Sequence, residues 1–334
     1  TCGKRRDIQL KGSGRTPFSR NGDGKAGLGP VLREYLIGEA MHALGVPTTR
    51  ALAAVTTGDQ VFRETSLPGA VLTRIAASHL RVGTFQFFAA RGETEIVRQL
   101  ADYAIARHYP AARDADKPYL EFFTAVARAQ ALLVAEWMSI GFIHGVMNTD
   151  NTTISGETID YGPCAFMDVY DPDTVFSSID LRGRYAYANQ PSILTWNLAR
   201  LAETLITLVD PNQDRALELL TVRANEVSGM FVDAWLARMR LKIGLNSPED
   251  NDVKLINRLL EAMHQGKADF TLTFRHLSDV LRGNGTLVRT QFEDPAVFDA
   301  WESDWLVRLS REKVSARDCA CLLYTSPSPR DQLQ

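Results

Sequence analysis

Two short stretches decide how this chain is interpreted: HGVMNTDN at residues 144–151 and IDYG at residues 159–162. The first follows a long helical pattern, and a short strand-like run separates it from the second. Asn151 offers an amide oxygen and Asp160 offers a carboxylate, and hard oxygen ligands of this kind suit Mg²⁺ or Mn²⁺. The two stretches therefore predict that Asn151 and Asp160 hold a divalent cation.

The spacing of these residues matches the catalytic apparatus of protein kinases, in which H-R-D-x-x-x-x-N is followed by D-F-G. Asn151 and Asp160 take the two metal-binding positions of that pattern. Val146 stands at the position of the usual catalytic aspartate, and it cannot accept a proton. Asp150 is the only carboxylate left in the loop, so it is the candidate base, although an aspartate beside Asn and Thr also suits a turn or helix cap. His144 is interpreted as a structural residue that braces the loop.

A lysine and a glutamate upstream extend the comparison with kinases. DIQLK at residues 7–11 alternates polar and apolar residues like a half-buried strand, and a helix that begins near Pro30 follows. Kinases pair a strand lysine with a helix glutamate to hold phosphates. Lys11 fits the lysine; of the two helix glutamates, Glu34 is the predicted partner and Glu39 is interpreted as a solvated charge.

Short strands are predicted in the next part of the chain. The runs at residues 51–56, 60–64 and 70–76 have strand composition, with Gly58-Asp59 and Pro68-Gly69 as turns between them. The first hundred residues are therefore predicted to be mixed, with strands around one helix.

The pattern then changes to helices, at residues 96–109, 118–142 and several times within 191–281. The predicted fold class is α+β, with the two-lobed architecture of protein kinases. The small mixed lobe is predicted at residues 1–90, and the larger helical lobe, with the catalytic and metal-binding loops, at residues 91–315.

The composition is that of an ordinary folded protein of 334 residues, with 45% apolar and 23% charged residues. Lys and Arg number 37 against 40 Asp and Glu, so no basic field predicts binding to nucleic acid or to an anionic membrane. The best candidate for a membrane span, residues 131–142, is too short and contains Glu136. Four unevenly placed cysteines suit a reducing compartment, so we expect a cytoplasmic protein, or a mitochondrial one in a eukaryotic relative.

Both ends of the chain depart from the pattern of a complete domain. The chain opens with Thr1 and reaches a strand pattern by Asp7, which predicts a first lobe that is truncated at its N-terminus. Residues 320–334 have no periodicity, contain Ser-Pro pairs and resemble translated vector sequence. We therefore predict that they form a non-native or disordered tail.

Five segments carry a more specific resemblance: LKGSGRTPFSR (10–20), GDGKA (22–26), PTTRAL (47–52), HGVMNTDN (144–151) and DYGP (160–163). On these segments the chain resembles the selenoprotein O family of kinase-like proteins, from about residue 7 to residue 311. Members of that family are pseudokinases by motif and act as protein adenylyltransferases, which bind ATP in a flipped orientation and transfer AMP to Ser, Thr or Tyr hydroxyls. The family's glycine-bearing nucleotide segment lies upstream of the LKG strand and is not found in this chain.

The resemblance implies roles in nucleotide binding for residues of the small lobe. Lys11, paired with Glu34, would hold the phosphates. Asp23 and Gly24 would line the nucleotide pocket.

The resemblance also implies how the phosphate tail and the reacting groups are held. Arg74 and Arg81 would bind the phosphates that leave as pyrophosphate, because a flipped nucleotide buries this tail and needs additional cations there. Asn151 and Asp160 would ligate Mg²⁺ or Mn²⁺. Asp150 would accept the proton of the attacking hydroxyl.

The resemblance thus implies a metal-dependent protein adenylyltransferase with ATP and proteins as its substrates. Two alternatives remain open: a true kinase that uses Asp150 as a displaced base, and a nucleotide-binding scaffold without turnover. The retained Lys11, Asn151 and Asp160 argue against the scaffold, because binding alone does not require both metal ligands.

Overall fold

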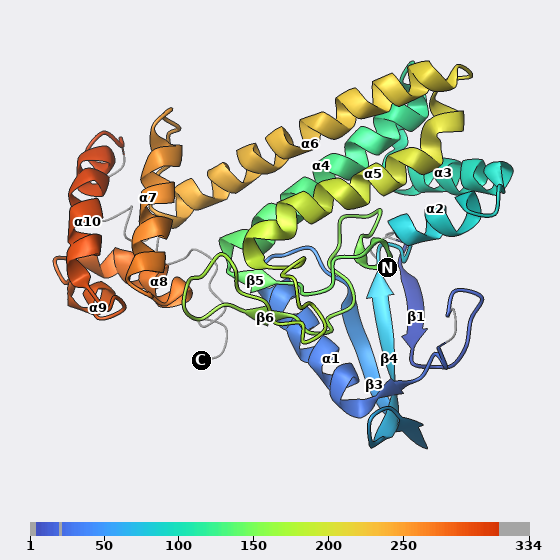
Figure 1. Ribbon diagram of the computed structural model, residues 1–334, viewed down its shortest axis with the longest axis horizontal. Coiled ribbons are helices and arrows are strands. Elements are labelled where there is room, and N and C mark those ends of the chain that lie inside the picture. Colours follow the sequence, from blue (N-terminus) through green and yellow to red (C-terminus); the bar gives the residue numbers. More distant parts are fainter. Residues whose placement is uncertain (1–4, 20–21, 314–334) are drawn as a thin grey trace. The chain divides into compact units, whose positions relative to one another are not determined.

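The computed structural model describes residues 5–19 and 22–313. The chain divides into two compact units, each built from several segments, which Figure 1 shows with their helices and strands labelled. The first unit comprises Thr1–Leu133, Val146–Pro163 and Ser192–Ser228, and the second comprises Val134–Gly145, Cys164–Pro191 and Gly229–Gln334. The predicted lobe boundary near residue 90 stays a prediction, and the predicted tail, residues 320–334, lies outside the described residues.

An antiparallel sheet forms the base of the first unit. Within the described residues it contains four strands: β1 (Asp7–Lys11), β2 (Ala26–Gly27), β3 (Arg50–Phe62) and β4 (Ser66–Ala76). Strand β4 is central, since it pairs with β1, β2 and β3. Helix α1 (Leu28–Ala43) packs along β3 and β4 (Figure 1), and Val31 of the helix is buried with Ala70 and Leu72 of β4.

Strand β1 places polar residues on the face that α1 covers. Gln9 lies directly opposite the buried Arg74 of β4, and Lys11 lies two residues further along the same face. The apolar residues Ile8 and Leu10 point the other way and are 65% and 53% exposed. The alternation was therefore a correct signal for a strand, but its polar side is the one that faces the interior.

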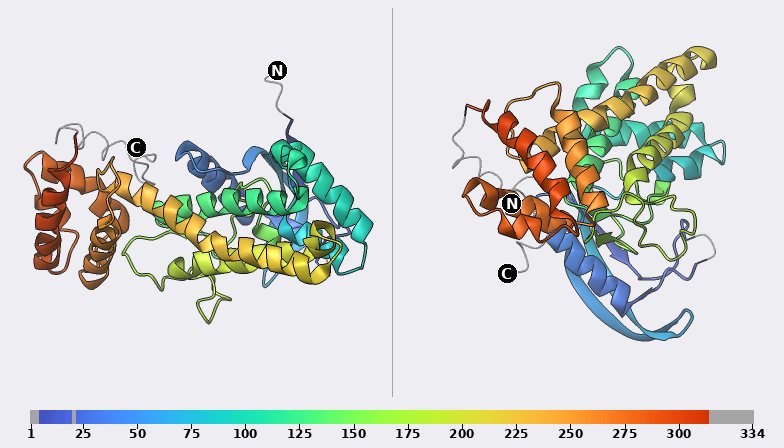
Figure 2. Two further views of the ribbon diagram at one scale, coloured as in Figure 1. Left: turned by 90° about the horizontal axis from the view of Figure 1, so that it is seen from above. Right: turned by 60° about the vertical axis from the view of Figure 1, so that its left-hand side comes forward.

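The hairpin of β3 and β4, the long curved ribbon in Figure 2, corrects the predicted turns. Strand β3 continues through Gly58, whose φ of 81° fits a shift of register within the strand. Gly69 lies inside β4, where a Cβ would come within 2.7 Å of Thr57 Oγ1, so this glycine permits close approach of the strands. The chain reverses instead at residues 63–65, where the Arg63 N–H donates to the Thr65 carbonyl.

The first unit also contains helices that follow the sheet in sequence. These are α2 (Val82–Ala89), α3 (Thr94–His108), α4 (Pro118–Ser139), α5 (Gln190–Val209) and α6 (Gln213–Lys242), with the 3₁₀ turns η1 (Pro110–Asp114) and η2 (Thr149–Asn151). Helices α4 and α6 continue into the second unit. The predicted helices at residues 96–109 and 118–142 are confirmed, with α4 ending at Ser139. Helix α2 was not predicted, because its eight mostly apolar residues show no polar face.

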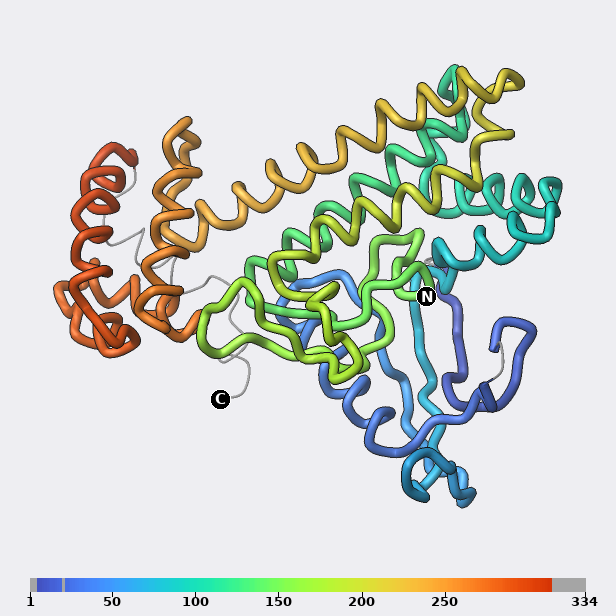
Figure 3. The backbone as a smooth tube through the Cα atoms, in the orientation of Figure 1, coloured from blue at the N-terminus to red at the C-terminus, as the bar shows by residue number. Residues whose placement is uncertain are grey.

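The second unit is mainly helical. It contains the short pair β5 (Phe142–Ile143) and β6 (Ala165–Phe166), the turn η3 (Tyr187–Asn189), and the helices α7 (Asp252–Gln265), α8 (Phe270–Leu281), α9 (Thr286–Arg289) and α10 (Pro295–Leu309). Between β6 and η3 the chain follows an irregular path, drawn in green in Figure 3. Trp301 and Trp305 stack in the core. No helix in the described part of the chain combines the length and the apolar character that crossing a bilayer requires.

Candidate functional site

A network of charged side chains joins β1, α1, β4 and the DYG turn of the first unit. The Lys11 ammonium donates to Glu34 Oε2 at 2.7 Å and also to Asp160 Oδ1. The Arg74 guanidinium donates to both oxygens of Glu34, at 2.5 and 2.8 Å, and to Asp160 Oδ1 at 2.8 Å. The structure thus brings together four of the predicted site residues, which come from distant parts of the sequence.

The choice between the two glutamates of α1 is settled by these contacts. The predicted pairing of Lys11 with Glu34 is confirmed. The interpretation of Glu39 as a solvated charge was wrong. Its carboxylate accepts two hydrogen bonds from Arg50, at 2.8 and 2.5 Å. The two glutamates lie five residues apart, so they emerge on different sides of the helix.

The network keeps its carboxylates ionised although Glu34 is buried and Asp160 is partly buried. Burial raises the pKa of Glu34, but the charges of Arg74 and Lys11 outweigh it and lower the pKa. Burial also opposes the ionisation of Asp160, yet Lys11 and Arg74 hold the pKa of Asp160 far below its usual range. Two cations and two anions therefore balance one another.

Arg81 adds a positive charge to this balanced network. Its Nη2 lies 3.5 Å from Gln9 Oε1, and among the described residues it forms no ion pair. Burial, and then repulsion from Arg74, lower the pKa of Arg81 more than the charges of Asp160, Asp150 and Glu34 raise it, but a guanidinium stays protonated in proteins. A partly buried, protonated arginine without an ion pair is suited to bind an anion from solution.

Two residues beside the arginines were missed by the sequence analysis. Gln9 Oε1 accepts hydrogen bonds from Arg74 at 2.9 Å and from Arg81 at 3.5 Å. It stands two residues before Lys11 in an alternating strand, so the strand period could have revealed it. His79 has a buried Nε2 without a hydrogen-bond partner in the described part of the chain. Burial, together with Arg74 and Arg81, lowers the pKa of His79 to about 4, so the ring is neutral.

The loop that carries Asp150 and Asn151 is held by side-chain amides. The Asn151 Nδ2 donates to the Val146 carbonyl at 2.9 Å, and the Asn197 Nδ2 donates to the Met147 carbonyl at the same distance. Because the amide nitrogen of Asn151 is used in this way, its amide oxygen is the atom that can face a cation.

Asp160 has an unusual backbone conformation. Its φ is 69°, a value that non-glycine residues rarely adopt and that recurs at functional sites. The following residue, Tyr161, is buried and its hydroxyl is hydrogen bonded to Thr48 Oγ1, which anchors the turn. Both contacts of the Asp160 carboxylate with described residues use Oδ1, so Oδ2 is the oxygen that we expect to face a cation.

Asn151 and Asp160 could hold a divalent metal only together with ligands from outside the protein. Within the described ranges, no three His, Cys, Asp or Glu side chains gather into a metal site. Mg²⁺ bound with a nucleotide needs only one or two protein groups, since the phosphates and water supply the other oxygens. One amide oxygen and one carboxylate oxygen satisfy that requirement.

Asp23 and Gly24 lie outside the network. The Asp23 carboxylate accepts hydrogen bonds from Arg63, at 2.9 and 3.0 Å, and from the Lys25 N–H at 2.9 Å. The bond from Arg63 is the main reason that the pKa of Asp23 falls to about 2. The Gly24 carbonyl accepts from the Gly14 N–H at 3.1 Å. No hydrogen bond between described residues joins Asp23 to the network, so its role in the nucleotide pocket stays a prediction.

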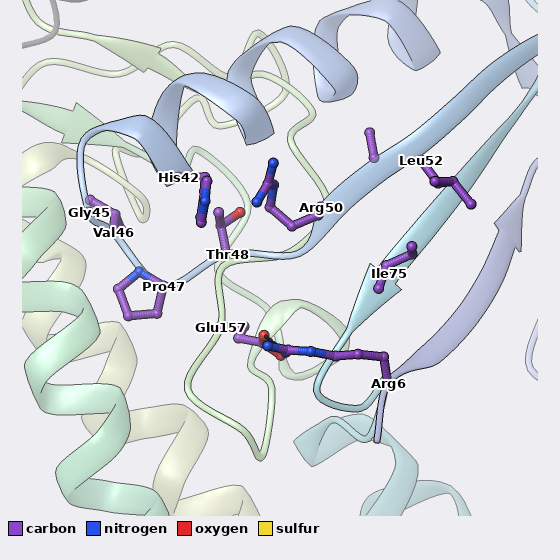
Figure 4. Close-up of a pocket in the computed structure, with 11 residues that line it drawn as sticks. Arg6, His42, Gly45, Val46, Pro47, Thr48, Arg50, Leu52, Ile75 and Glu157 are labelled. Atoms are coloured by element: carbon purple, nitrogen blue, oxygen red, sulfur yellow. Dashed lines mark hydrogen bonds and ion pairs between the residues drawn. The ribbon is translucent and has the colours of Figure 1, made fainter. Parts of the chain in front are cut away.

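A cavity of about 560 Å³ in the first unit contains none of the predicted site residues (Figure 4). Its labelled lining includes Arg6, His42, Thr48, Arg50 and Glu157. Arg6 lies 3.5 Å from Glu157, and Arg50 is bound to a helix carboxylate. Because its arginines are already paired, this cavity is a weaker candidate for a phosphate site than the network around Arg81.

His144 belongs to the second unit and is fully buried. Its backbone N–H donates to Gln190 Oε1 at 3.1 Å, and its ring lies 5.3 Å from the Trp137 ring, centroid to centroid. These surroundings agree with a structural role for His144.

Comparison with known proteins gives a consistent result. A family model described as protein adenylyltransferase SelO matches residues 1–320. The chain is 63% identical over 330 residues to a protein nucleotidyltransferase YdiU from Cereibacter sphaeroides (strain KD131 / KCTC 12085), covering 98% of this chain and 68% of the relative. It is 61% identical over 323 residues to the protein of the same name from Rhizobium meliloti (strain 1021), covering 96% and 66%. The chain therefore spans about two thirds of the length of these relatives.

Proposed function

The chain belongs to the protein adenylyltransferase SelO family, and we propose that the network of Lys11, Glu34, Arg74 and Asp160, with Arg81 and the loop at residues 146–154, binds ATP and transfers its AMP to a protein hydroxyl. The acceptors are Ser, Thr or Tyr side chains. Every component of this site lies in the first compact unit.

The charge of Arg81 is the observation that supports this proposal most strongly. Lys11 and Arg74 are neutralised by Glu34 and Asp160, whereas Arg81 is held beside them by a neutral amide and has no carboxylate partner among the described residues. Asp160, Asp150 and Glu34 favour the charge of Arg81 without forming an ion pair with it, and a partly buried arginine that lacks a direct carboxylate partner favours a polyanion. We assign Arg74 and Arg81 to the phosphates that leave as pyrophosphate, and Lys11 to the phosphates nearer the adenosine.

Asn151 and Asp160 are the residues that would hold Mg²⁺ or Mn²⁺. When bound, such a cation neutralises charge on the phosphate oxygens. The protein's part is to keep the Asp160 carboxylate ionised, which the neighbouring Lys11 and Arg74 do by lowering its pKa. The hydrogen bonds from Lys11 of β1 and Arg74 of β4 hold that carboxylate in place.

Asp150 is the proton acceptor in this proposal. The acceptor oxygen forms a bond to the α-phosphorus, and the bond from that phosphorus to the bridging oxygen breaks, so pyrophosphate leaves. The hydroxyl proton passes to the Asp150 carboxylate. A general base of this kind contributes about 10²- to 10⁴-fold to the rate.

We also propose that the first unit contains the small lobe of a kinase-like fold with ATP in the flipped orientation. The support is the pairing of a strand lysine with a helix glutamate, followed in sequence by the loop at residues 146–154 and the DYG turn. Activity in the cytoplasm is part of the same proposal.

The test is to incubate the protein with a candidate acceptor and with ATP labelled on either the α- or the γ-phosphate, in Mg²⁺ or Mn²⁺. We expect α-label on protein, and none with Asp160→Ala. Asp304→Ala, which changes an exposed aspartate of α10, is the matched control and should retain the label. Transfer of γ-label alone would establish a kinase. Metal-dependent ATP binding without any label would establish a scaffold.

A further inference from the structure

Gly83, the second residue of α2, lies against the side chain of Asp150. A Cβ on Gly83 would be 2.1 Å from Asp150 Oδ1, 3.2 Å from its Cγ and 3.3 Å from its Cα. Cβ atoms do not approach other atoms as closely as the first of these distances. The φ of Gly83 lies outside the left-handed region, so backbone conformation does not require a glycine here. The space that glycine leaves is therefore occupied by the Asp150 carboxylate.

Backbone hydrogen bonds fix the separation between α2 and the Asp150 loop. The Val82 N–H donates to the Thr152 carbonyl, and the Ile154 N–H donates to the Leu80 carbonyl, both at 2.9 Å. These bonds lie on either side of an antiparallel bridge between residues 81 and 153. Because the two backbones are tied together, a side chain added at residue 83 cannot be relieved by moving the helix away.

The first turn of α2 also suits a carboxylate. The N–H groups of a first helical turn have no partner within the helix, and the helix dipole favours a negative charge there. Arg81 is the N-cap residue of the same helix. One short segment therefore carries an arginine of the proposed phosphate site and faces the candidate base.

We propose that Gly83 is a positioning residue, which leaves room for the Asp150 carboxylate at the first turn of α2 and so sets the base at a fixed place relative to Arg81. This inference rests on the proposed role of Asp150 as the base. It concerns a residue that touches neither ATP nor the acceptor in the proposed mechanism. The atom that a new Cβ at residue 83 would meet first is the end of a short side chain, so the carboxylate moves while the fold is retained.

The first experiment compares Gly83→Ala with Gly29→Ala in the full chain. Gly29 is likewise the second residue of a helix, α1, and a Cβ there would meet nothing within 4 Å. We expect Gly83→Ala to lower kcat for AMP transfer about 10- to 100-fold, since displacements near 1 Å have effects of this size, with the KM for ATP changed less than about twofold. Gly29→Ala should behave like wild type. Unchanged kcat in Gly83→Ala, or a rise in KM alone, would overturn the inference.

A second experiment measures thermal unfolding without reference to activity. Gly83→Ala is made in the wild type and in the Asp150→Ala background, and the two decreases in the midpoint temperature are compared. We expect the decrease to shrink by more than half when residue 150 is alanine, because the atoms at 2.1 and 3.2 Å are then absent. Equal decreases would show that Gly83 acts through other neighbours and would overturn the inference. A wild-type protein that transfers no AMP would overturn the proposed function. The difference between the two decreases in midpoint temperature would still test whether Gly83 makes room for the Asp150 side chain.

Discussion

Each compact unit buries a network of charged side chains, and the two networks differ in how completely they are paired. In the second unit, Asp252 accepts from Arg240 Nε at 2.8 Å and from Arg308 Nε at 2.7 Å, one on each oxygen. The remaining nitrogens of Arg308 donate to Glu312 at 2.9 Å and to the Ser247 carbonyl at 2.6 Å. Every nitrogen of this guanidinium and both oxygens of this carboxylate have a protein partner.

The network of the first unit is equally buried at Glu34 and Arg74, but some of the polar groups around this pair are not fully paired. Arg81 has no carboxylate partner among the described residues, and the hydrogen bonds to Asp160 use only one of its two oxygens. The backbone of Asp160 also has a positive φ. Burial of charge therefore does not by itself identify a binding site. Incomplete pairing beside the buried charge does, because it leaves groups for a ligand.

The largest effect on stability is expected from Asp252→Asn. Removing this charge takes from the partly buried Arg240 its carboxylate partner and leaves the buried Arg308 with Glu249 and Glu312 only, and breaking a buried ion pair costs about 3–5 kcal/mol of the free energy of unfolding. AMP transfer per folded molecule should be unchanged, because the network has no part in the proposed site. Urea unfolding measures the first quantity, and transfer of α-label at low temperature measures the second.

The comparison between the networks fails if Asp252→Asn loses transfer activity while it remains folded. In that case both networks would contribute to function, and complete pairing would not distinguish a structural network from a binding site.

A smaller effect, on binding, is expected from Arg81→Met. Hydrogen bonds to charged groups contribute about 1.5–3 kcal/mol, so the Kd for ATP should rise about 10- to 150-fold. Stability should change little, since no ion pair of Arg81 with a described residue is lost. Equilibrium binding of a fluorescent ATP analogue measures the Kd.

The exposed Arg98, which pairs with Glu95 on α3, offers a control: Arg98→Met should bind ATP as the wild type does. If Arg81→Met binds ATP normally but unfolds more readily than the wild type, Arg81 stabilises the fold and does not bind the nucleotide.

The smallest effect is expected from pH. The unfolded chain protonates His79 near pH 6.5, whereas burial and the charges of Arg74 and Arg81 lower the pKa in the folded protein to about 4. The unfolded state therefore binds more protons between these values, and stability falls as pH decreases from about 6.5 to 4. His79→Gln removes this contribution, so its midpoint temperature should decrease less between pH 7.5 and 5 than that of the wild type.

The exposed His42 provides the control for this measurement, and His42→Gln should follow the wild type. Equal pH dependence in wild type and His79→Gln would show that His79 is hydrated in the folded protein.

Much of the candidate site could be predicted from the sequence, because several of its residues belong to short motifs whose spacing indicates their chemistry. The residues Lys11, Asp150, Asn151 and Asp160 each stand in a short segment whose composition and order are informative without a fold. The choice of Glu34 over Glu39 also followed from the motif, and the contact with Lys11 confirms it. The proposed roles of all these residues remain for experiment.

Other features depend on contacts between segments that are distant in the sequence. The alternation of β1 predicted a strand, but only its register against β4 decided that Gln9 and Lys11 face inward while Ile8 and Leu10 are exposed. The space that Gly83 leaves for a loop far along the chain has no local signal at all.

The amino-acid sequence was sufficient to specify the class of chemistry, the strand and helix that carry Lys11 and Glu34, and the helical character of the second half of the chain. These properties follow from residue type and periodicity, which act over a few residues. The tertiary structure alone decided which charges are paired and which remain for a ligand. Pairing depends on distances between side chains from different elements, and it separates the complete network at Asp252 from the incomplete one at Arg81.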